Sequence, residues 1–323
     1  MSIKLALIMT QKNESLFLEP WRIRYHVDLI DTSSIFIYDN GSTDSKTLTT
    51  LAAAENMGLK IDRNYNHQKD YYARGELFAD LIKSLDASNP HDFYFPIDCD
   101  EFLVCDIDGK LSCQRDYILV SLAPLVRDGK PLTIPHKYVD SPYHINRYSK
   151  ITNCKKCFFA QGACEALSDG FHEGKSKNGS QERQAKITYI EFHYKPYADH
   201  MRLNAQIIDY LIPTLSRKNL AAYAKSKRSN YHAAHALLES EYSYRRYFAN
   251  QPSTTFNSCL LDRFKDLNII TDPLFSDQST NTRKAQIAIR AKHLAMKAQD
   301  KAEEVLAHLR SIAGFVKRRL PRF

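Results

Sequence analysis

The chain has 323 residues, of which 43% are hydrophobic and 25% charged, a composition typical of globular proteins that bury a core. No apolar run approaches the ~20 residues that span a bilayer, and the first residues lack a signal-peptide pattern, so we expect a cytoplasmic protein that is at most peripheral at the inner membrane face. The formal net charge of +8 resides in residues 283–323, where eleven Lys or Arg face three Asp or Glu; the remainder is neutral and is not expected to bind nucleic acid.

The first hundred residues alternate between strand and helix patterns. Short runs rich in apolar and aromatic residues predict strands, and longer segments with apolar residues at helical spacing predict helices. In chain order the expected elements are a strand at 3–9, a helix at 14–30, a strand at 34–38, a helix at 46–57, a strand at 59–61, a helix at 71–85 and a strand at 92–97. This order predicts an open parallel α/β sheet with helices on both faces.

Polar clusters follow three of the expected strands, at residues 10–14, 39–44 and 98–101. Sheets of this kind bind ligands at the carboxyl ends of their strands. We therefore expect the three clusters to meet and to form a nucleotide site.

The most informative cluster is Asp98-Cys99-Asp100-Glu101. Side chains two apart on an extended segment share a face, so Asp98 and Asp100 can point at one cation. Mg²⁺ or Mn²⁺ prefers carboxylate oxygens and would neutralise charge on a diphosphate leaving group. Taken alone, the same residues would equally suit a solvated acidic turn.

The two earlier clusters also allow a functional and a structural interpretation. Asp39 ends a strand, where it could accept from a base N–H, but its segment would also suit an ordinary turn with a capped helix. Thr10, Asn13 and Glu14 are polar residues that open an expected helix, where the helix dipole favours anions.

The rest of the chain is irregular to about residue 200 and helical beyond it. Short strands are expected at 132–134 and 187–192, and the polar stretch 168–180 is expected to be a loop at the mouth of the site. Residues 284–316 place apolar side chains on one helical face before a basic end. That pattern predicts a helix packed on the catalytic domain, an anchor on an anionic membrane surface, or both.

Seven cysteines are present, an odd number. Cys154 and Cys157 form a CxxC motif with Cys164 close behind, but no second ligand pair completes a zinc site. We expect free, buried thiols.

The order and spacing of the motifs resemble family 2 glycosyltransferases, and most closely a bacterial subgroup with a KNE…W…YH…YDNxSxD…DxDEF pattern. The matching stretches are TQKNES (10–15), Trp21, YH (25–26), IYDNGSTD (37–44) and FPIDCDEFLV (95–104). Three weaker stretches lie at 155–159, 168–174 and 191–197.

The resemblance implies a GT-A fold, an α/β class with a Rossmann-like mixed sheet flanked by helices, here followed by a helical C-terminal region. It divides the chain into a catalytic domain at 1–200, with a donor half to about 105 and an acceptor half at 106–200, and a helical region at 201–323. It further implies a nucleotide-sugar donor, with UDP favoured, and a divalent metal. The nucleotide would be held by Thr10, Asn13, Glu14, Asp39, Asp98 and Lys195, and the metal by Asp98, Asp100 and His193.

Two of these assignments have plain alternatives. His193 would also suit a core histidine at a strand end, and Lys195 would also suit a solvent-facing lysine. The subgroup often has an arginine-serine pair after this histidine, where this chain has Lys195-Pro196-Tyr197.

An inverting transferase needs a base for the acceptor hydroxyl. Four residues near the expected mouth of the site are candidates, with Asp169 preferred: Glu165, Asp169, His172 and Glu173. The expected acceptor is a glycan or a lipid-linked glycan of the cell envelope. Two other functions stay open: a non-catalytic carbohydrate- or nucleotide-binding protein on the same scaffold, and another nucleotide-sugar enzyme.

Overall fold

The computed structural model describes residues 3–14, 18, 23–140, 146–179, 181–249 and 255–269. Contacts divide the chain into two units: Met1–Pro196 with Gln251–Phe275, and Tyr197–Asn250 with Ser276–Phe323. The basic region 283–323 and the helix expected at 284–316 lie outside the described residues.

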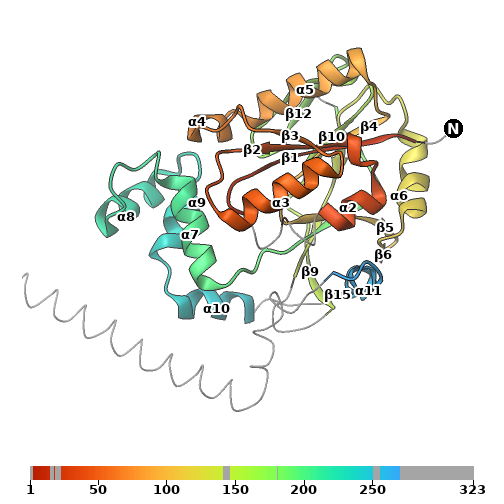
Figure 1. Cartoon of the computed structure of the whole chain (residues 1–323). Coiled ribbons are helices and arrows are strands. Elements are labelled where there is room, and N and C mark those ends of the chain that lie inside the picture. Colours follow the sequence, from red (N-terminus) through yellow and green to blue (C-terminus); the bar gives the residue numbers. More distant parts are fainter. Residues whose placement is uncertain are drawn as a thin grey trace, which may run out of the picture. The chain divides into compact units, whose positions relative to one another are not determined.

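A seven-stranded sheet runs through the first unit in the order β13-β7-β10-β4-β1-β2-β3 (Figure 1). Strands β1 to β4 pair in parallel, whereas β10 is antiparallel to both β4 and β7. The predicted α/β class with a Rossmann-like mixed sheet is confirmed, and the wholly parallel sheet that the strand-helix order predicts is corrected. The strands are β1 Leu5–Gln11, β2 Ile35–Asp39, β3 Lys60–Asp62, β4 Phe93–Pro96, β7 Leu132–Ile134, β10 Lys156–Ala160 and β13 Arg183–Gln184.

Both faces of the central strands β1 and β4 are buried, and helices cover the sheet on its two sides (Figure 1). The odd-numbered residues of β1 from Leu5 to Met9 belong to one apolar cluster, and the alternate Ala6 and Ile8 belong to another. This period of two places successive side chains on opposite faces. Helices α2 (Ile23–Leu29) and α3 (Ser45–Asn56) supply the first cluster, and α5 (Arg74–Ser88) supplies the second.

A second, six-stranded sheet in the same unit is not predicted from the sequence. Its order is β15-β9-β8-β14-β5-β6. Residues 97–100 connect β4 of the first sheet to β5 of the second, so the Asp98–Asp100 motif lies where the chain crosses between the sheets. The strands are β5 Glu101–Ile107, β6 Lys110–Ser112, β8 Lys137–Asp140, β9 Arg147–Ile151, β14 Ile187–Glu191 and β15 Thr255–Phe256.

The remaining elements are short. The stretch expected to be a loop at 168–180 contains β12 Gly174–Ser176, which pairs with β11 Cys164–Leu167. Of the helix expected at 14–30, the described part is α2. The other elements of the first unit are the 3₁₀ turns Thr32–Ser34 and Ala123–Leu125, α4 Gln68–Tyr71, α6 Arg115–Leu122 and α11 Cys259–Asp266. The second unit contains α7 Tyr197–Ile208, α8 Arg217–Ser226, α9 Tyr231–Leu238 and α10 Glu241–Ala249.

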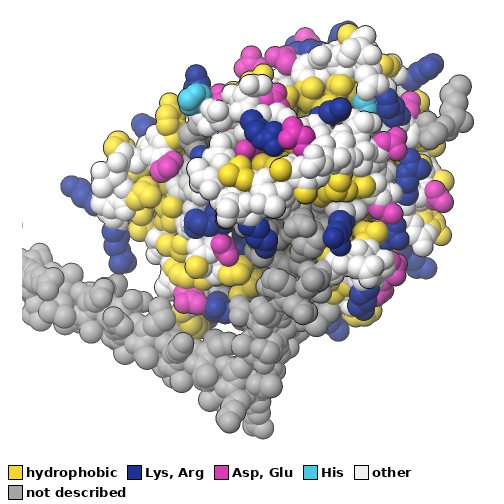
Figure 2. Space-filling model, in the orientation of Figure 1, with side chains coloured by type: hydrophobic (Ala, Val, Ile, Leu, Met, Phe, Trp, Pro, Cys, Tyr) yellow, Lys and Arg dark blue, Asp and Glu magenta, His cyan; other side chains and the backbone are white. Residues whose placement is uncertain are grey.

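The surface of the described residues carries mixed charge. On the face that Figure 2 shows, Lys and Arg side chains are interspersed with Asp and Glu. Among the helices of the described residues, none has the length and apolarity that a bilayer crossing requires.

Candidate functional site

Side-chain hydrogen bonds join the carboxyl ends of β1 and β2. Gln11 and Asp39 are the last residues of these strands and pair in register. Gln11 Nε2 donates to Asp39 Oδ1, and Ser42 Oγ donates to the same oxygen over 2.6 Å. The hydrogen bonds that described residues make to this carboxylate all fall on Oδ1. Oδ2 is therefore the oxygen that could accept from a ligand.

Asn13 links the first polar cluster to the second. Its Oδ1 accepts from the backbone N–H groups of Thr43 and Asp44, at 2.8 and 2.9 Å. Its backbone is left-handed, with φ of 55°, a conformation that Asn adopts more readily than most residues. Asn13 thus has a structural role that its sequence position does not reveal. Thr10 lies within β1, opposite Tyr38 of β2, rather than in the loop that follows the strand.

The loop after β3 is attached to the same edge of the sheet. Asn40 Nδ2 donates to the carbonyl oxygens of Tyr65 and His67, at 2.9 and 2.8 Å. Gly41 has φ of 74°, and a Cβ there would lie 2.7 Å from the carbonyl oxygen of Asn66. Only glycine allows this close approach without strain, so residues 39–44 are built to hold the ends of three strands together.

A buried lysine holds Asp98. Lys156, the first residue of β10, places Nζ 2.5 Å from Asp98 Oδ2 and 2.5 Å from Glu101 Oε2. Glu101 Oε2 also accepts from the backbone N–H of Asp98 at 2.8 Å. The side chains of Lys156 and Glu101 are each 3% exposed, whereas that of Asp98 is 36% exposed. Lys156 therefore holds the acidic loop from the buried side, and the Asp98 side chain stays partly exposed to solvent.

The two carboxylates on Lys156 have opposite pKa shifts. Burial raises the pKa of Glu101 to about 8, because the attraction of Lys156 does not offset the loss of water. Burial also opposes ionisation of Asp98, but Lys156 and Arg74 outweigh it and lower the pKa of Asp98 to about 2. Asp98 is therefore the ionised member of the pair at neutral pH.

Asp100 faces a second lysine. Lys195 Nζ lies 2.8 Å from Asp100 Oδ2, and the two side chains are 13% and 20% exposed. Burial opposes the charge of Lys195, but Asp100 and Glu14 outweigh it and raise the lysine pKa. The structure thus places Lys195 beside Asp100 and within the field of Glu14, rather than in open solvent. The first polar cluster and the Asp98–Asp100 motif meet at this lysine.

His193 lies two residues beyond β14, the strand that pairs with β5 beside the acidic loop. Glu191, the last residue of β14, pairs with Glu101 of β5, and the N–H of Phe192 donates to the carbonyl oxygen of Asp100 at 2.9 Å. His193 Nδ1 lies 2.8 Å from Glu191 Oε1, and Lys137 Nζ bonds the other oxygen of Glu191. The imidazole is 51% exposed, so the interpretation of His193 as a core histidine is wrong.

Asp169, the preferred base, contacts the first residues of α5 from the turn between β11 and β12. Its Oδ1 accepts from the backbone N–H of Gly75 at 3.2 Å, and its carbonyl accepts from Arg74 Nε. A Cβ on Gly75 would lie 2.3 Å from the carbonyl oxygen of Leu167, so glycine permits this contact between helix and hairpin. Arg74 contributes to the electrostatics of both Asp98 and Asp169, which places this aspartate at the border of the site.

The other three base candidates differ in their surroundings. His172 Nδ1 lies 2.6 Å from the carbonyl oxygen of Lys155, beside the buried Lys156. Glu173 donates its backbone N–H to Ser168 Oγ at 3.0 Å, within the β11–β12 turn. Glu165 is exposed on β11 and pairs across the hairpin with Lys175 at 3.4 Å. Glu165 is thus tied to the hairpin's own lysine.

The expected metal ligands are present but already paired with protein groups. Asp98 and Asp100 each contact a lysine, and His193 contacts Glu191. Within the described ranges, no three His, Cys, Asp or Glu side chains gather as a protein-only cage. Mg²⁺ is commonly held by one or two carboxylates plus substrate phosphates, and Asp98 and Asp100 are two carboxylates on one loop. The residues therefore fit a metal whose coordination the donor's phosphates complete.

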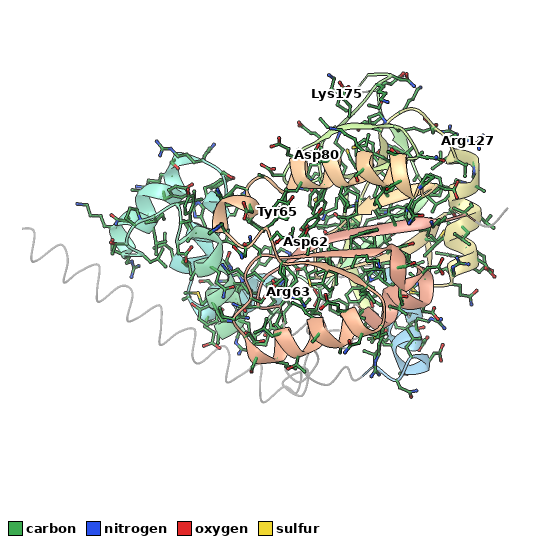
Figure 3. The ribbon with its side chains drawn as sticks, turned by 45° about the horizontal axis from the view of Figure 1, so that its top comes forward. Asp62, Arg63, Tyr65, Asp80, Arg127 and Lys175 are labelled. Atoms are coloured by element: carbon green, nitrogen blue, oxygen red, sulfur yellow. The ribbon has the colours of Figure 1, made fainter. Side chains whose placement is uncertain are left out.

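A groove of about 650 Å³ lies elsewhere, along the edge strand β3. Its walls come from β2, β3, α3 and α5, and in Figure 3 Asp62, Arg63 and Tyr65 lie between the ribbons of α3 and α5. None of the predicted site residues lines it. The candidate site is defined by its charged side chains rather than by this groove.

Sequence reasoning missed the residues that support the motif. Lys156 and Arg74 neutralise Asp98, while Glu191 and Lys137 position His193. Arg74 reaches the motif from α5, whereas strand pairing brings the other three to it. Lys156 and Glu191 lie in two of the weaker matching stretches, at 155–159 and 191–197, but the sequence assigned no role to either residue.

No protein-family model matches this chain, and no curated protein matches it. Among solved structures, the chain is similar to S. aureus TarS 1-349 in complex with UDP-GlcNAc, with a TM-score of 0.35 and 9% identity over 91% of this chain and 92% of that one. It is also similar to the mannosyltransferase PcManGT from Pyrobaculum calidifontis in complex with GDP-Man and Mn²⁺, with a TM-score of 0.33 and 12% identity over 90% and 87% of the two chains.

A further crystal structure of S. aureus TarS gives a TM-score of 0.33 and 10% identity over 89% of this chain. The chain spans 55% of the length of that TarS structure. These TM-scores mark a distant likeness, so the assignment of function depends on this chain's own residues.

Proposed function

We propose that the chain is a glycosyltransferase that takes a sugar from a nucleotide-diphosphate donor, with a UDP-sugar preferred. The observation that carries the proposal is the ion pair between Asp100 and Lys195. Glu14 also favours the charged form of this lysine. It brings together residues of the first and third polar clusters, while Asn13 ties the second cluster to the first. Charged and polar groups at the carboxyl ends of neighbouring strands are where α/β sheets bind nucleotides.

The nucleoside end of the donor would lie at β1 and β2. Asp39 Oδ2 is available to accept the imide N–H of uracil, because Gln11 and Ser42 hold the other oxygen. Glu14, Asn13 and Thr10 lie on the same edge and would face the ribose. A buried acceptor discriminates against bases that offer no N–H there, which favours uracil.

The diphosphate would lie between Lys195 and the acidic loop. Lys195 would bind phosphate oxygens, and Asp98, Asp100 and His193 would hold a divalent cation. When bound, Mn²⁺ or Mg²⁺ supplies charge neutralisation for the leaving diphosphate. Lys156 keeps Asp98 in place from the protein side, and Glu191 orients the imidazole of His193.

The acceptor hydroxyl would approach from the β11–β12 turn. Asp169 would take its proton as the hydroxyl attacks the anomeric carbon, which gives inversion. Gly75 holds one oxygen of Asp169 and leaves the second for the acceptor. His172 and Glu173, on the same turn, are the alternative bases, and Glu165 is the least favoured because it pairs with Lys175.

The acceptor is proposed to be a glycan or lipid-linked glycan, with the basic region 283–323 touching an anionic membrane surface. Co-sedimentation with phosphatidylglycerol vesicles tests that part, comparing the full chain with a truncation after Gly314. Equal binding by both forms, or binding insensitive to salt, would contradict it.

A nucleotide-sugar turnover assay separates the proposal from its alternatives. The full chain is incubated with a panel of UDP- and GDP-sugars, with Mn²⁺ or with chelator, and release of the nucleoside diphosphate is measured. A transferase releases it slowly to water even without its acceptor, and Asp100→Asn abolishes the release. Binding without release would favour a non-catalytic protein, and cleavage within the diphosphate would favour another nucleotide-sugar enzyme.

A further inference from the structure

Two cysteines from distant parts of the first unit lie in direct contact. Cys113 Sγ is 3.0 Å from Cys259 Sγ, across a sequence separation of 146 residues. All seven cysteines are free thiols, and this contact joins two of their sulfur atoms. A disulfide requires a separation of about 2.05 Å, so about 1 Å of side-chain movement would join them.

The backbone around the pair is already fixed. Cys113 follows β6, and Cys259 is the first residue of α11. Asn257 Nδ2 donates to the carbonyl oxygen of Leu111 at 3.3 Å, and Asn257 Oδ1 accepts from the N–H of Cys259 at 2.8 Å. These bonds hold the start of α11 against the end of β6, so bond formation would need little rearrangement of the main chain.

Three of the other cysteines, including both members of the CxxC motif, contact groups other than sulfur. Cys105 Sγ lies 2.9 Å from Ser121 Oγ. Cys154 Sγ is 3.9 Å from the Tyr189 hydroxyl, whereas Cys157 Sγ donates to a backbone carbonyl at 3.4 Å. The CxxC motif is therefore not the pair that the fold places for oxidation.

We propose that Cys113 and Cys259 form a disulfide under oxidising conditions and so fasten α11 to the six-stranded sheet. The oxidant is a low-molecular-weight disulfide such as oxidised glutathione. The Cys259 thiolate attacks one sulfur of the oxidant and releases one thiol; the Cys113 thiolate then attacks the Cys259 sulfur and releases the second. The protein loses two electrons and two protons, and the oxidant becomes two thiols.

The two thiols differ in a way that sets the order of these steps. Cys259 is partly exposed, whereas Cys113 is 3% exposed. Burial raises the pKa of the Cys113 thiol, so it stays protonated longer. The oxidant therefore reacts first at Cys259, and Cys113 completes the bond slowly.

The disulfide would link a helix that packs against residues next to the acidic loop. Phe264 of α11 packs against Phe102 and Phe192, with ring centroids 5.3 and 6.3 Å apart. Phe102 follows Glu101, and Phe192 precedes His193. A covalent link at the start of α11 would hold this aromatic support in place. The Cys113–Cys259 disulfide does not depend on the proposed function.

The test is a thiol count on the full chain. The reduced protein is equilibrated with oxidised glutathione, unfolded under acid quench, and its free thiols are titrated and mapped by peptide mass spectrometry. We expect the count to fall from seven to five, with a Cys113–Cys259 peptide, and the apparent melting temperature to rise.

The matched variants are Cys259→Ser, which should keep all six of its thiols, and Cys164→Ser, which should fall from six to four. Retention of seven thiols by the wild type would overturn the proposal. A disulfide at Cys154–Cys157 instead, or an equal loss of thiols in Cys259→Ser, would also overturn it.

Discussion

Lys156 Nζ lies 2.5 Å from Glu101 Oε2, and both side chains are 3% exposed. Lys156 Nζ also contacts Asp98 Oδ2. Loss of this buried lysine is costly, because the ionised Asp98 loses its cation and the buried Glu101 Oε2 loses a hydrogen-bond donor. The support of the acidic loop is therefore a stability determinant as well as part of the proposed donor site.

Lys156→Met is expected to lower the free energy of unfolding by about 3 kcal/mol, because the ionised Asp98 loses its cation and the buried Glu101 Oε2 loses its donor. Urea denaturation measures the change. The neighbouring Lys155→Met is the matched control: that lysine is 42% exposed in its pair with Glu182, so its loss should cost at most about 1 kcal/mol. Equal effects of the two substitutions would show that the buried pair does not support the loop.

Asp100→Asn is expected to abolish donor turnover while the protein stays folded, with a lower melting temperature because Lys195 loses its charged partner. The substitution keeps the shape of the side chain but removes the charge that faces Lys195. Asp80→Asn, on α5 and paired with Lys83, is the control and should retain full turnover. Wild-type turnover by Asp100→Asn in the presence of chelator would remove this residue from a metal-binding role.

Asp169→Asn tests the proposed base. The amide oxygen can still accept from Gly75, so the hairpin should keep its place while kcat falls by about 10²–10⁴-fold and KM changes little. Steady-state kinetics with the identified acceptor measures both. Glu165→Gln, on the neighbouring strand β11, should leave kcat unchanged. If Asp169→Asn is active and His172→Ala or Glu173→Gln is not, the base lies at one of the other two residues.

Asp140 gives the fold a pH dependence. Burial raises its pKa to about 7, against the N–H groups of Tyr194 and His193 that bond it. The folded state thus keeps a proton that the unfolded chain loses near pH 4. Stability falls as pH rises from about 4 to about 7, by at most about 1.4 kcal/mol per pH unit.

Chemical denaturation of the wild type and Asp140→Asn at several pH values checks this. The stability advantage of the wild type over the variant should shrink as pH rises through this window and then level off. A constant difference between the two proteins from pH 4 to pH 8 would show that Asp140 does not hold the proton.

Local patterns predicted the first four strands because each is an apolar run bounded by polar residues. The strand ends were misjudged by one or two residues: β1 continues to Gln11 and β2 to Asp39, so these side chains pair in register. The positions of Asp39 and Asp100 at the carboxyl ends followed from the same patterns, because parallel strands bring their ends to one edge.

The second sheet could not be predicted in the same way. Strand β5 directly follows the acidic motif, and its partner β14 comes from Ile187–Glu191, about eighty residues later. The strand at 187–192 was expected from its apolar run, but local patterns do not reveal that it pairs with β5. Lys156 was missed for the same reason, since only the pairing of β10 with β4 brings it to Asp98.

Residues at the ends of β1, β2 and β4 are proposed to bind a nucleoside diphosphate. Isothermal titration calorimetry of the full chain with UDP and with GDP, each with Mn²⁺, measures this binding. We predict that UDP binds more tightly than GDP and that Asp39→Asn and Asp100→Asn each weaken UDP binding, whereas Asp80→Asn does not. Absence of binding by both nucleotides, or UDP binding that none of these substitutions alters, would contradict the account.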